Sequence, residues 1–186
     1  MTPLDAVGMA FSDHAGWDEL RRIPPRLDRI AVRLALPLSL LPPAMIYFAG
    51  THHGDAFLPG FGARAWLPIA VAFFFAEWVS IALMSLAVKA IAAAHDVRCS
   101  HRDAFLLALV PPVPMWISSL GLVSPNFLVA FSIAVAGFLM AVALTYHGIR
   151  SGHRVRDEIV ALSMTQGITG VGLIAWGLLL VMLIPG

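Results

Sequence analysis

The first candidate for chemistry is an acidic residue inside a long apolar stretch. Glu77 lies in the aromatic-rich segment 73–78. A charge at the centre of a bilayer costs at least about 2.5 kcal/mol on insertion scales. We therefore expect the Glu77 side chain to be protonated, paired inside a helix bundle, or facing water. Two interpretations stay open: a proton or substrate site, and a carboxylic acid that ties helices together, with Ser80 as a local partner.

Prolines interrupt another apolar stretch at about the same depth as Glu77. Each proline removes a backbone donor and leaves a carbonyl without its helical hydrogen bond. Such carbonyls need partners in protein or in a water-lined cavity. Broken helices mark binding sites in transporters, whereas kinks also simply shape compact bundles. Gln166 is predicted at a comparable depth. The candidate intramembrane polar site comprises Glu77, Ser80, Pro111, Pro112, Pro114 and Gln166.

Small residues recur at helical spacing near the end of the chain. Ser163, Gly167, Gly170 and Gly177 share one predicted helix face. Small side chains allow close approach of helix backbones in lipid. This candidate helix-packing face serves either packing within the chain or the seam of a homodimer.

Two polar loops contain residue types that bind metals, but their spacing fits no zinc motif. Zinc requires three or four ligands at fixed geometry, and neither loop has paired finger spacing or a His-Glu-x-x-His sequence. We expect solvated loops, with no metal and no cofactor. The absence of a phosphate-binding glycine loop, a nucleophile elbow and paired carboxylates predicts that the protein is not an enzyme. The loop residues are His52, His53 and Asp55, and His95, Asp96, Cys99, His101 and Asp103.

The composition indicates the elements that must position these residues. Of 186 residues, 59% are apolar and 12% are charged, and the mean hydropathy is +0.84, whereas a soluble domain has about 25% charged residues. Five segments reach the length of about 20 residues that a membrane helix needs. We predict an all-α polytopic membrane bundle in the lipid bilayer, with no nucleic-acid partner. Its transmembrane helices cover about 30–49, 65–94, 104–123, 127–149 and 159–184 of a domain spanning 30–186.

Basic residues predict the orientation, because cytoplasmic flanks collect Lys and Arg. Eleven of the twelve basic residues fall on the N-terminal flank or on the second and fourth connections. Only Arg64 falls on the other side. This pattern places the N-terminus in the cytoplasm and the C-terminus outside.

Residues 1–29 form the predicted cytoplasmic tail. Trp17, Leu20 and Ile23 recur at helical spacing before Pro24 and Pro25. This pattern favours a short amphipathic helix that either lies on the membrane surface or packs as a cap on the bundle. The tail lacks the pattern of a secretory signal, so we expect the first apolar segment to remain as an anchor.

Two short motifs resemble a known family. The segment 108–114, Ala-Leu-Val-Pro-Pro-Val-Pro, is similar to the proline-bearing third crossing of the YIP-domain (Ypt/Rab-interacting protein) family. The segment 146–149, Tyr-His-Gly-Ile, is similar to the end of its fourth crossing. The chain resembles most closely the bacterial inner-membrane branch, which implies a five-helix bundle of non-enzymatic type. The Asp-Leu-Tyr-Gly-Pro motif of eukaryotic members has no match here, so Rab binding is not carried over.

Two functions follow as expectations. The first is an inner-membrane scaffold or accessory subunit that acts through helix–helix contacts, as a homo-oligomer or with other membrane proteins. The alternative is a small transporter or channel-like protein that uses Glu77 and the proline-broken third helix, which requires a water-accessible cavity at Glu77.

Overall fold

A computed structural model describes residues 31–152, 155–181, 183 and 184. Within these residues the chain is helical and contains no strand. Five spans are long and apolar enough to cross a membrane, which confirms the predicted all-α fold with five such helices. The predicted amphipathic helix of the tail lies outside the described residues. The spans are Ala31–Phe57, Trp66–Ala94, His101–Val123, Phe127–Ser151 and Glu158–Val181.

The first span comprises three helical pieces: the π-helix η1 (Ala31–Ala35), α4 (Leu36–Ser39) and α5 (Leu41–Phe57). It continues past residue 49, where we expected the first crossing to end. Thr51 donates a hydrogen bond to the carbonyl of Tyr47 at 2.8 Å, and the His52 ring donates to the carbonyl of Phe48 at 3.0 Å. These bonds let polar residues continue the helix, up to a non-helical backbone conformation at His53.

The second span is one long helix, α6 (Trp66–Ala94), preceded by the short 3-10 helix η2 (Phe61–Ala63). At 1.5 Å per residue α6 is roughly 43 Å long, which exceeds a hydrocarbon layer of about 30 Å. The helix therefore has length to tilt or to project beyond the layer.

The third span is broken where the sequence predicts it. It consists of α7 (His101–Leu109), α8 (Pro112–Ser118) and the 3-10 helix η3 (Ser119–Val123). The Ser100 side chain caps α7 by accepting a hydrogen bond from the Asp103 amide at 3.1 Å. Pro111 and Pro112 lack the N–H groups that would continue the ladder, so the break falls between α7 and α8.

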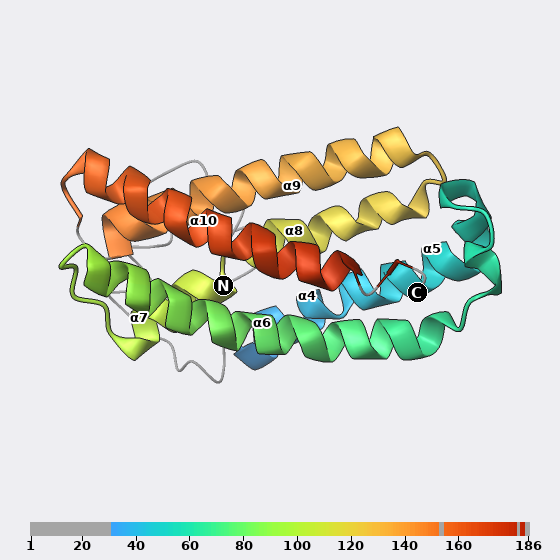
Figure 1. Cartoon of the computed structure of the whole chain (residues 1–186), viewed down its shortest axis with the longest axis horizontal. Coiled ribbons are helices and arrows are strands. Elements are labelled where there is room, and N and C mark those ends of the chain that lie inside the picture. The colour runs from blue at the N-terminus through green and yellow to red at the C-terminus, as the bar shows by residue number, and fades with distance from the viewer. Residues whose placement is uncertain (1–30, 153–154, 182, 185–186) are drawn as a thin grey trace.

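The last two spans are α9 (Phe127–His147), extended by the π-helix η4 (Gly148–Gly152), and α10 (Glu158–Val181). Asn126 caps α9 and Asp157 caps α10, each accepting a backbone N–H at 2.9 Å. In Figure 1, α10 crosses in front of α8 and runs from the neighbourhood of α9 towards α5 and α6. It packs against α6 and α9 and makes no comparable contact with α8, which pairs with α9.

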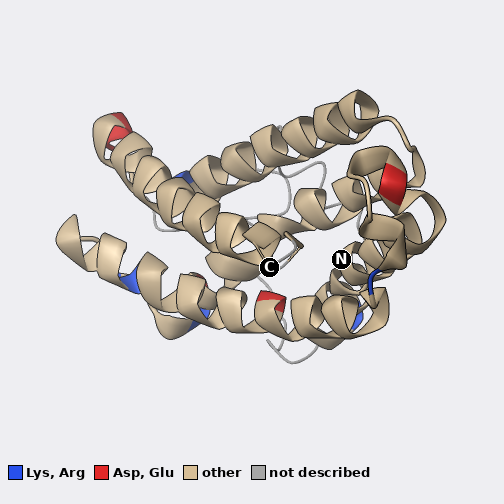
Figure 2. Ribbon diagram, turned by 45° about the vertical axis from the view of Figure 1, so that its right-hand side comes forward, with Lys and Arg blue, Asp and Glu red and all other residues tan. Residues whose placement is uncertain are grey.

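Charged side chains are few between the helix ends. Most of each ribbon in Figure 2 is tan for this reason. Arg64, the exception to the basic-residue pattern, has local partners: its guanidinium donates to the carbonyl of Leu183 and lies 5.4 Å from the ring centroid of Phe61 and 5.3 Å from that of Trp66. Arg64 thereby joins the α5–α6 connection to the end of α10.

Candidate functional site

Glu77 connects two helices in the interior of the bundle. Its side chain is only 7% exposed. Its Oε1 atom accepts a hydrogen bond from the Nε1 atom of Trp116 on α8 at 3.1 Å. The other oxygen, Oε2, is buried and has no hydrogen-bond partner within the described residues. Glu77 thus ties α6 to α8 and keeps one polar atom unused.

The next residue of α6 makes a parallel connection to a different helix. The Nε1 atom of Trp78 donates to the Oγ atom of Ser39 on α4 at 3.2 Å, and Ser39 in turn donates to the carbonyl of Leu36 at 3.1 Å. Ser39 is fully buried. Glu77 and Trp78 therefore connect α6 to α8 and to α4. In both hydrogen bonds an indole N–H donates to a buried side-chain oxygen.

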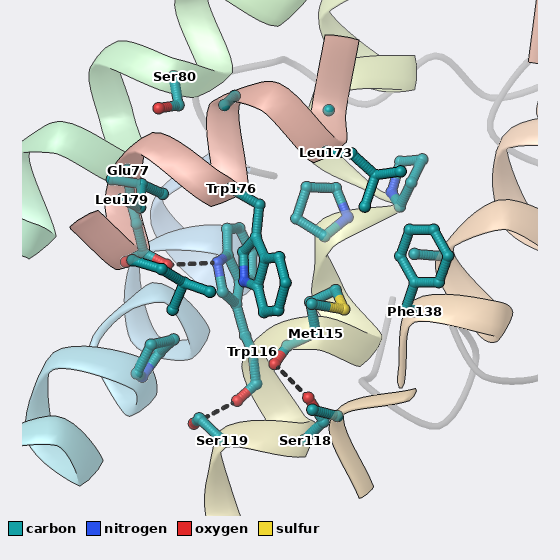
Figure 3. Close-up of a pocket in the computed structure, with 18 of the residues that line it drawn as sticks. Glu77, Ser80, Met115, Trp116, Ser118, Ser119, Phe138, Leu173, Trp176 and Leu179 are labelled. Atoms are coloured by element: carbon teal, nitrogen blue, oxygen red, sulfur yellow. Dashed lines mark hydrogen bonds between the residues drawn. The ribbon is translucent and has the colours of Figure 1, made fainter. Parts of the chain in front are cut away.

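Glu77 lines a cavity of about 670 Å³. The cavity lies between α10 and α8, with residues of α6 and α9 on its sides. Figure 3 shows Trp176 and Leu173 extending from α10, Trp116 and Met115 from α8, and Phe138 from α9. The lining is mainly apolar, and Glu77 is its only charged residue among those described. This volume is typical of sites for small molecules.

The structure brings most of the predicted polar site together. Ser80, Pro111 and Pro112 line the same cavity as Glu77. Pro114 is buried beside it, where its carbonyl oxygen lies close to Gly137 of α9. Since Pro111 and Pro112 carry no N–H, they cannot donate to the carbonyls of residues 107 and 108, and both of these residues line the cavity.

Gln166 lies apart from this cluster. Its side chain is exposed on α10, and it is not among the residues that line the cavity. The inward face of α10 is formed instead by Ala161, Met164, Thr165 and Ile168, which are buried. Gln166 lies on the opposite side of the helix and does not extend the Glu77 cluster.

The predicted small-residue face of α10 divides into two parts. The Ser163 hydroxyl group and His95 Nε2 share a hydrogen bond of 2.9 Å. A Cβ atom added at Gly167 would lie 3.4 Å from the side chain of Ile91 on α6. At Gly170 and Gly177 a Cβ atom would meet nothing within 4 Å. The first two positions thus border α6, whereas the last two face away from the bundle.

The structure places His52, His53 and Asp55 within helix α5 and not on a loop, and most residues of the two predicted polar clusters have structural partners. His53 Nε2 donates to the carbonyl of Leu122 at 2.9 Å, and Asp55 Oδ1 accepts from the amides of Gly60 and Gly62 at 2.9 and 3.0 Å. In the other cluster, His101 is the first residue of α7, and one of its ring nitrogens lies 2.9 Å from Lys89 Nζ. The described residues contain no group of three or more side chains placed to hold a metal ion.

Cys99, in the connection between α6 and α7, is half-buried. Burial raises the pKa of its thiol, and the nearby Asp103 carboxylate raises this pKa further. A reactive cysteine requires the opposite shift, because the thiolate is the nucleophile. The Cys99 environment therefore gives no support for covalent catalysis.

Sequence reasoning missed three residues of this region. Trp116 and Trp176 line the cavity from different helices, and Gly137 allows α9 to approach α8, where an added Cβ atom would lie 2.7 Å from the Cβ of Ser118. The sequence did offer a signal for Trp116, because the N–H group of a tryptophan in a membrane segment requires an acceptor. No local signal distinguished Gly137 from the other glycines.

The lengths of the five spans and their exposed apolar side chains are those of a multi-pass membrane protein. A family model for the Yip1 domain matches residues 7–184 of the chain. The chain therefore belongs to the Yip1 domain family, as the two short motifs indicated. No curated protein and no solved structure matched the chain.

Proposed function

We propose that this protein is a non-enzymatic scaffold or accessory subunit of a bacterial inner membrane, acting through helix–helix contacts with a second copy or with another membrane protein. Membership of the Yip1 domain family supports a membrane protein that is not an enzyme. The outward face of α10, formed by Ile159, Gln166, Gly170, Ile174 and Gly177, is the contact surface in this proposal.

The observation that carries the proposal is the exposure of Gln166. Its amide has no hydrogen-bond partner within the described residues. The residue lies roughly 12 Å along the helix axis from Glu158, and therefore within the span. An amide without partners in an apolar medium is unfavourable, and amide side chains hydrogen-bond across membrane helices. A partner helix that lies on this face would supply the missing hydrogen bond.

The rest of the face suits close approach of another helix. Gly170 and Gly177 leave open space around their α-carbons, and Ile159 and Ile174 are 79% and 67% exposed. Small residues beside large apolar ones give a partner backbone a groove and neighbouring side chains to pack against. The same face thus combines a polar anchor with a surface shaped for helix contact.

Site-specific photo-crosslinking in cells tests this proposal. A photoreactive amino acid replaces Ile174. Because Ile174 is itself large and exposed, the change in side-chain volume is small. The matched control replaces Leu139 on α9, which is 62% exposed but lies outside the proposed face. We expect a discrete product from Ile174 and none from Leu139. Twice the chain mass identifies a second copy, and another defined mass identifies a different protein. If both positions give only the uncrosslinked chain, the proposal is contradicted.

The proposed orientation has the N-terminus in the cytoplasm and the C-terminus outside. Its support is the collection of basic residues on alternate connections and the local partners of Arg64, which explain its position on the other side. Reporter domains fused after Gly186 test this: a reporter active only outside the cytoplasm should function, and a cytoplasmic reporter should not. The reverse result would overturn the orientation.

A further inference from the structure

Gln166 is the only polar residue among those that form the outward face of α10. Its amide is exposed within the span and has no hydrogen-bond partner among the described residues. An amide carries both N–H donors and a carbonyl acceptor. A group that satisfies it must therefore offer an acceptor and a donor together at the same depth. A second amide does so, because each N–H can donate to the other carbonyl.

A second copy of the chain places such an amide at the required depth. Two copies inserted in the same orientation are related by a two-fold axis perpendicular to the membrane. A two-fold interface uses the same surface patch on both chains. The two α10 helices then run parallel, and Gln166 of one copy lies at the same depth as Gln166 of the other. The chemistry of this position is thus complementary to itself.

The spacing of the face is that of a parallel helix pair. Ile159, Gln166, Gly170 and Gly177 follow one another at intervals of seven, four and seven residues. These intervals are those of the a and d positions along the seam of a coiled coil, a geometry that many membrane helices share. One polar residue at such a seam fixes the register and the number of helices.

The shape of the face is also complementary to itself. Gly170 and Gly177 leave open space, since an added Cβ atom at either would meet nothing within 4 Å. Ile174 lies between them along the helix and is 67% exposed. In a parallel pair, Ile174 of each chain lies at the level of the glycines of the other. The glycines allow the two backbones to approach closely.

The bundle holds α10 in place near both ends and leaves this face uncovered. His95 bonds to Ser163 near one end, and Arg64 bonds to the carbonyl of Leu183 just beyond the other. The face is therefore formed in the single chain. Because little of α10 has to become ordered on association, the entropic cost of pairing is reduced.

We propose that the partner on the outward face of α10 is a second copy of this chain, in a parallel two-fold dimer whose two Gln166 amides hydrogen-bond to each other. This inference rests on the proposed function as a protein that acts through helix–helix contacts, and it specifies the partner.

Energy transfer between full-length chains in phosphatidylcholine vesicles tests the amide pair. A trace of donor-labelled chain is titrated with acceptor-labelled chain, for the unaltered pair, the Gln166→Leu pair and the mixed pair. We expect the Gln166→Leu pair to associate about tenfold more weakly. The mixed pair should be at least as weak, because its single amide has lost its partner. A mixed pair midway between the other two would mean that Gln166 bonds to a different group, which would overturn the proposal.

Disulfide crosslinking tests the two-fold seam in a Cys99→Ser background. A residue at the seam faces its own equivalent, within the Cα separation of about 4.4–6.8 Å that a disulfide requires. Gly170→Cys should therefore give a disulfide-linked dimer on oxidation. The matched control is Gly172→Cys, on the face that lines the cavity, which should stay monomeric. Equal dimer from both variants would indicate random collision and would contradict the seam.

These results also separate this inference from the proposed function. A photo-crosslinked product from position 174 with the mass of a different protein, and no disulfide from Gly170→Cys, would overturn the dimer and leave the scaffold proposal in place. The absence of any product in both experiments would contradict both proposals. A product of twice the chain mass together with the Gly170→Cys dimer supports both.

Discussion

Glycines on α9 and on α10 have opposite surroundings. Where α9 meets α8, a Cβ atom at Gly137 would lie 2.7 Å from the Cβ of Ser118 and 2.9 Å from the carbonyl oxygen of Pro114. On α10, Gly170 and Gly177 have nothing within 4 Å, and Gly172 adjoins only Met84. Glycine brings α8 and α9 into contact, whereas on α10 it leaves surfaces unfilled.

This difference shows that the bundle has a tight part and an open part. The third span supplies the tight part: it contains the largest buried fraction of the five spans, and its α8 bonds to Glu77. The open part is α10, with one face over a cavity and another face outside. We therefore assign stability to the α6–α8–α9 contacts, and the proposed recognition of a partner to the outward face of α10.

The largest expected effect distinguishes the two glycine environments directly. Gly137→Leu should destabilise the protein by about 3 kcal/mol, because overpacking must separate α9 from the α8 backbone. Gly170→Leu should change stability by less than about 0.5 kcal/mol, since it enters open space. Reversible unfolding of both variants in detergent, followed by tryptophan fluorescence, measures the difference. Equal losses would remove the distinction between the two regions.

The Glu77–Trp116 bond is the next test of the tight part. Glu77→Leu should cost about 1–3 kcal/mol, because it leaves the buried Trp116 N–H without its acceptor. Glu77→Gln keeps an acceptor at the same place and should cost less. The double variant with Trp116→Phe completes a thermodynamic cycle. A coupling energy of zero between the two positions would mean that the hydrogen bond contributes nothing to stability.

Gln166→Leu tests the open part, and it should have opposite effects on two quantities. Association of the chain with its partner should weaken by about 0.6–2 kcal/mol, the range for hydrogen bonds between membrane helices. The isolated chain should become slightly more stable, because an exposed amide in the span is replaced by an apolar side chain. Association is measured by energy transfer between labelled chains in vesicles. Unchanged association together with higher stability would show that the amide simply faces lipid.

The smallest expected effect concerns the link between α6 and α4. Ser39→Ala removes the acceptor of the Trp78 N–H and should cost about 0.5–1.5 kcal/mol. The conservative variant Ser39→Thr keeps the hydroxyl group and serves as the control for hydrogen bonding. Denaturant unfolding measures both variants. If the Ser39→Ala protein is as stable as the unaltered chain, the hydrogen bond between Trp78 and Ser39 contributes little to the free energy of unfolding.

Hydropathy was sufficient to predict the architecture. Five long apolar stretches separated by short polar connections determine five helices, and the three prolines near residue 112 determine where the third span breaks. The first helix extends beyond the predicted end because the side chains of Thr51 and His52 bond to the carbonyls of Tyr47 and Phe48 in the preceding turn, a local effect that a hydropathy window averages out.

The site was predictable only in part, for a physical reason. A residue's depth follows from its position along a span, which grouped Glu77, Ser80 and the prolines, and Glu77, Ser80, Pro111 and Pro112 line one cavity in the structure. Which way a residue faces follows from amphipathicity, and α10 has apolar residues on all sides. Gln166 could not therefore be assigned to a face. The partner of Glu77, Trp116, lies on another helix and required the packed bundle to identify it.

The outward face of α10 can be tested in one measurement. Partner crosslinking from position 174 is compared in cells for Gly170→Leu, on the outward face, and for Gly172→Leu, on the face that lines the cavity. We expect Gly170→Leu to lose the crosslinked product and Gly172→Leu to keep it. If both variants keep the product, or both lose it, the outward face of α10 is not the recognition surface.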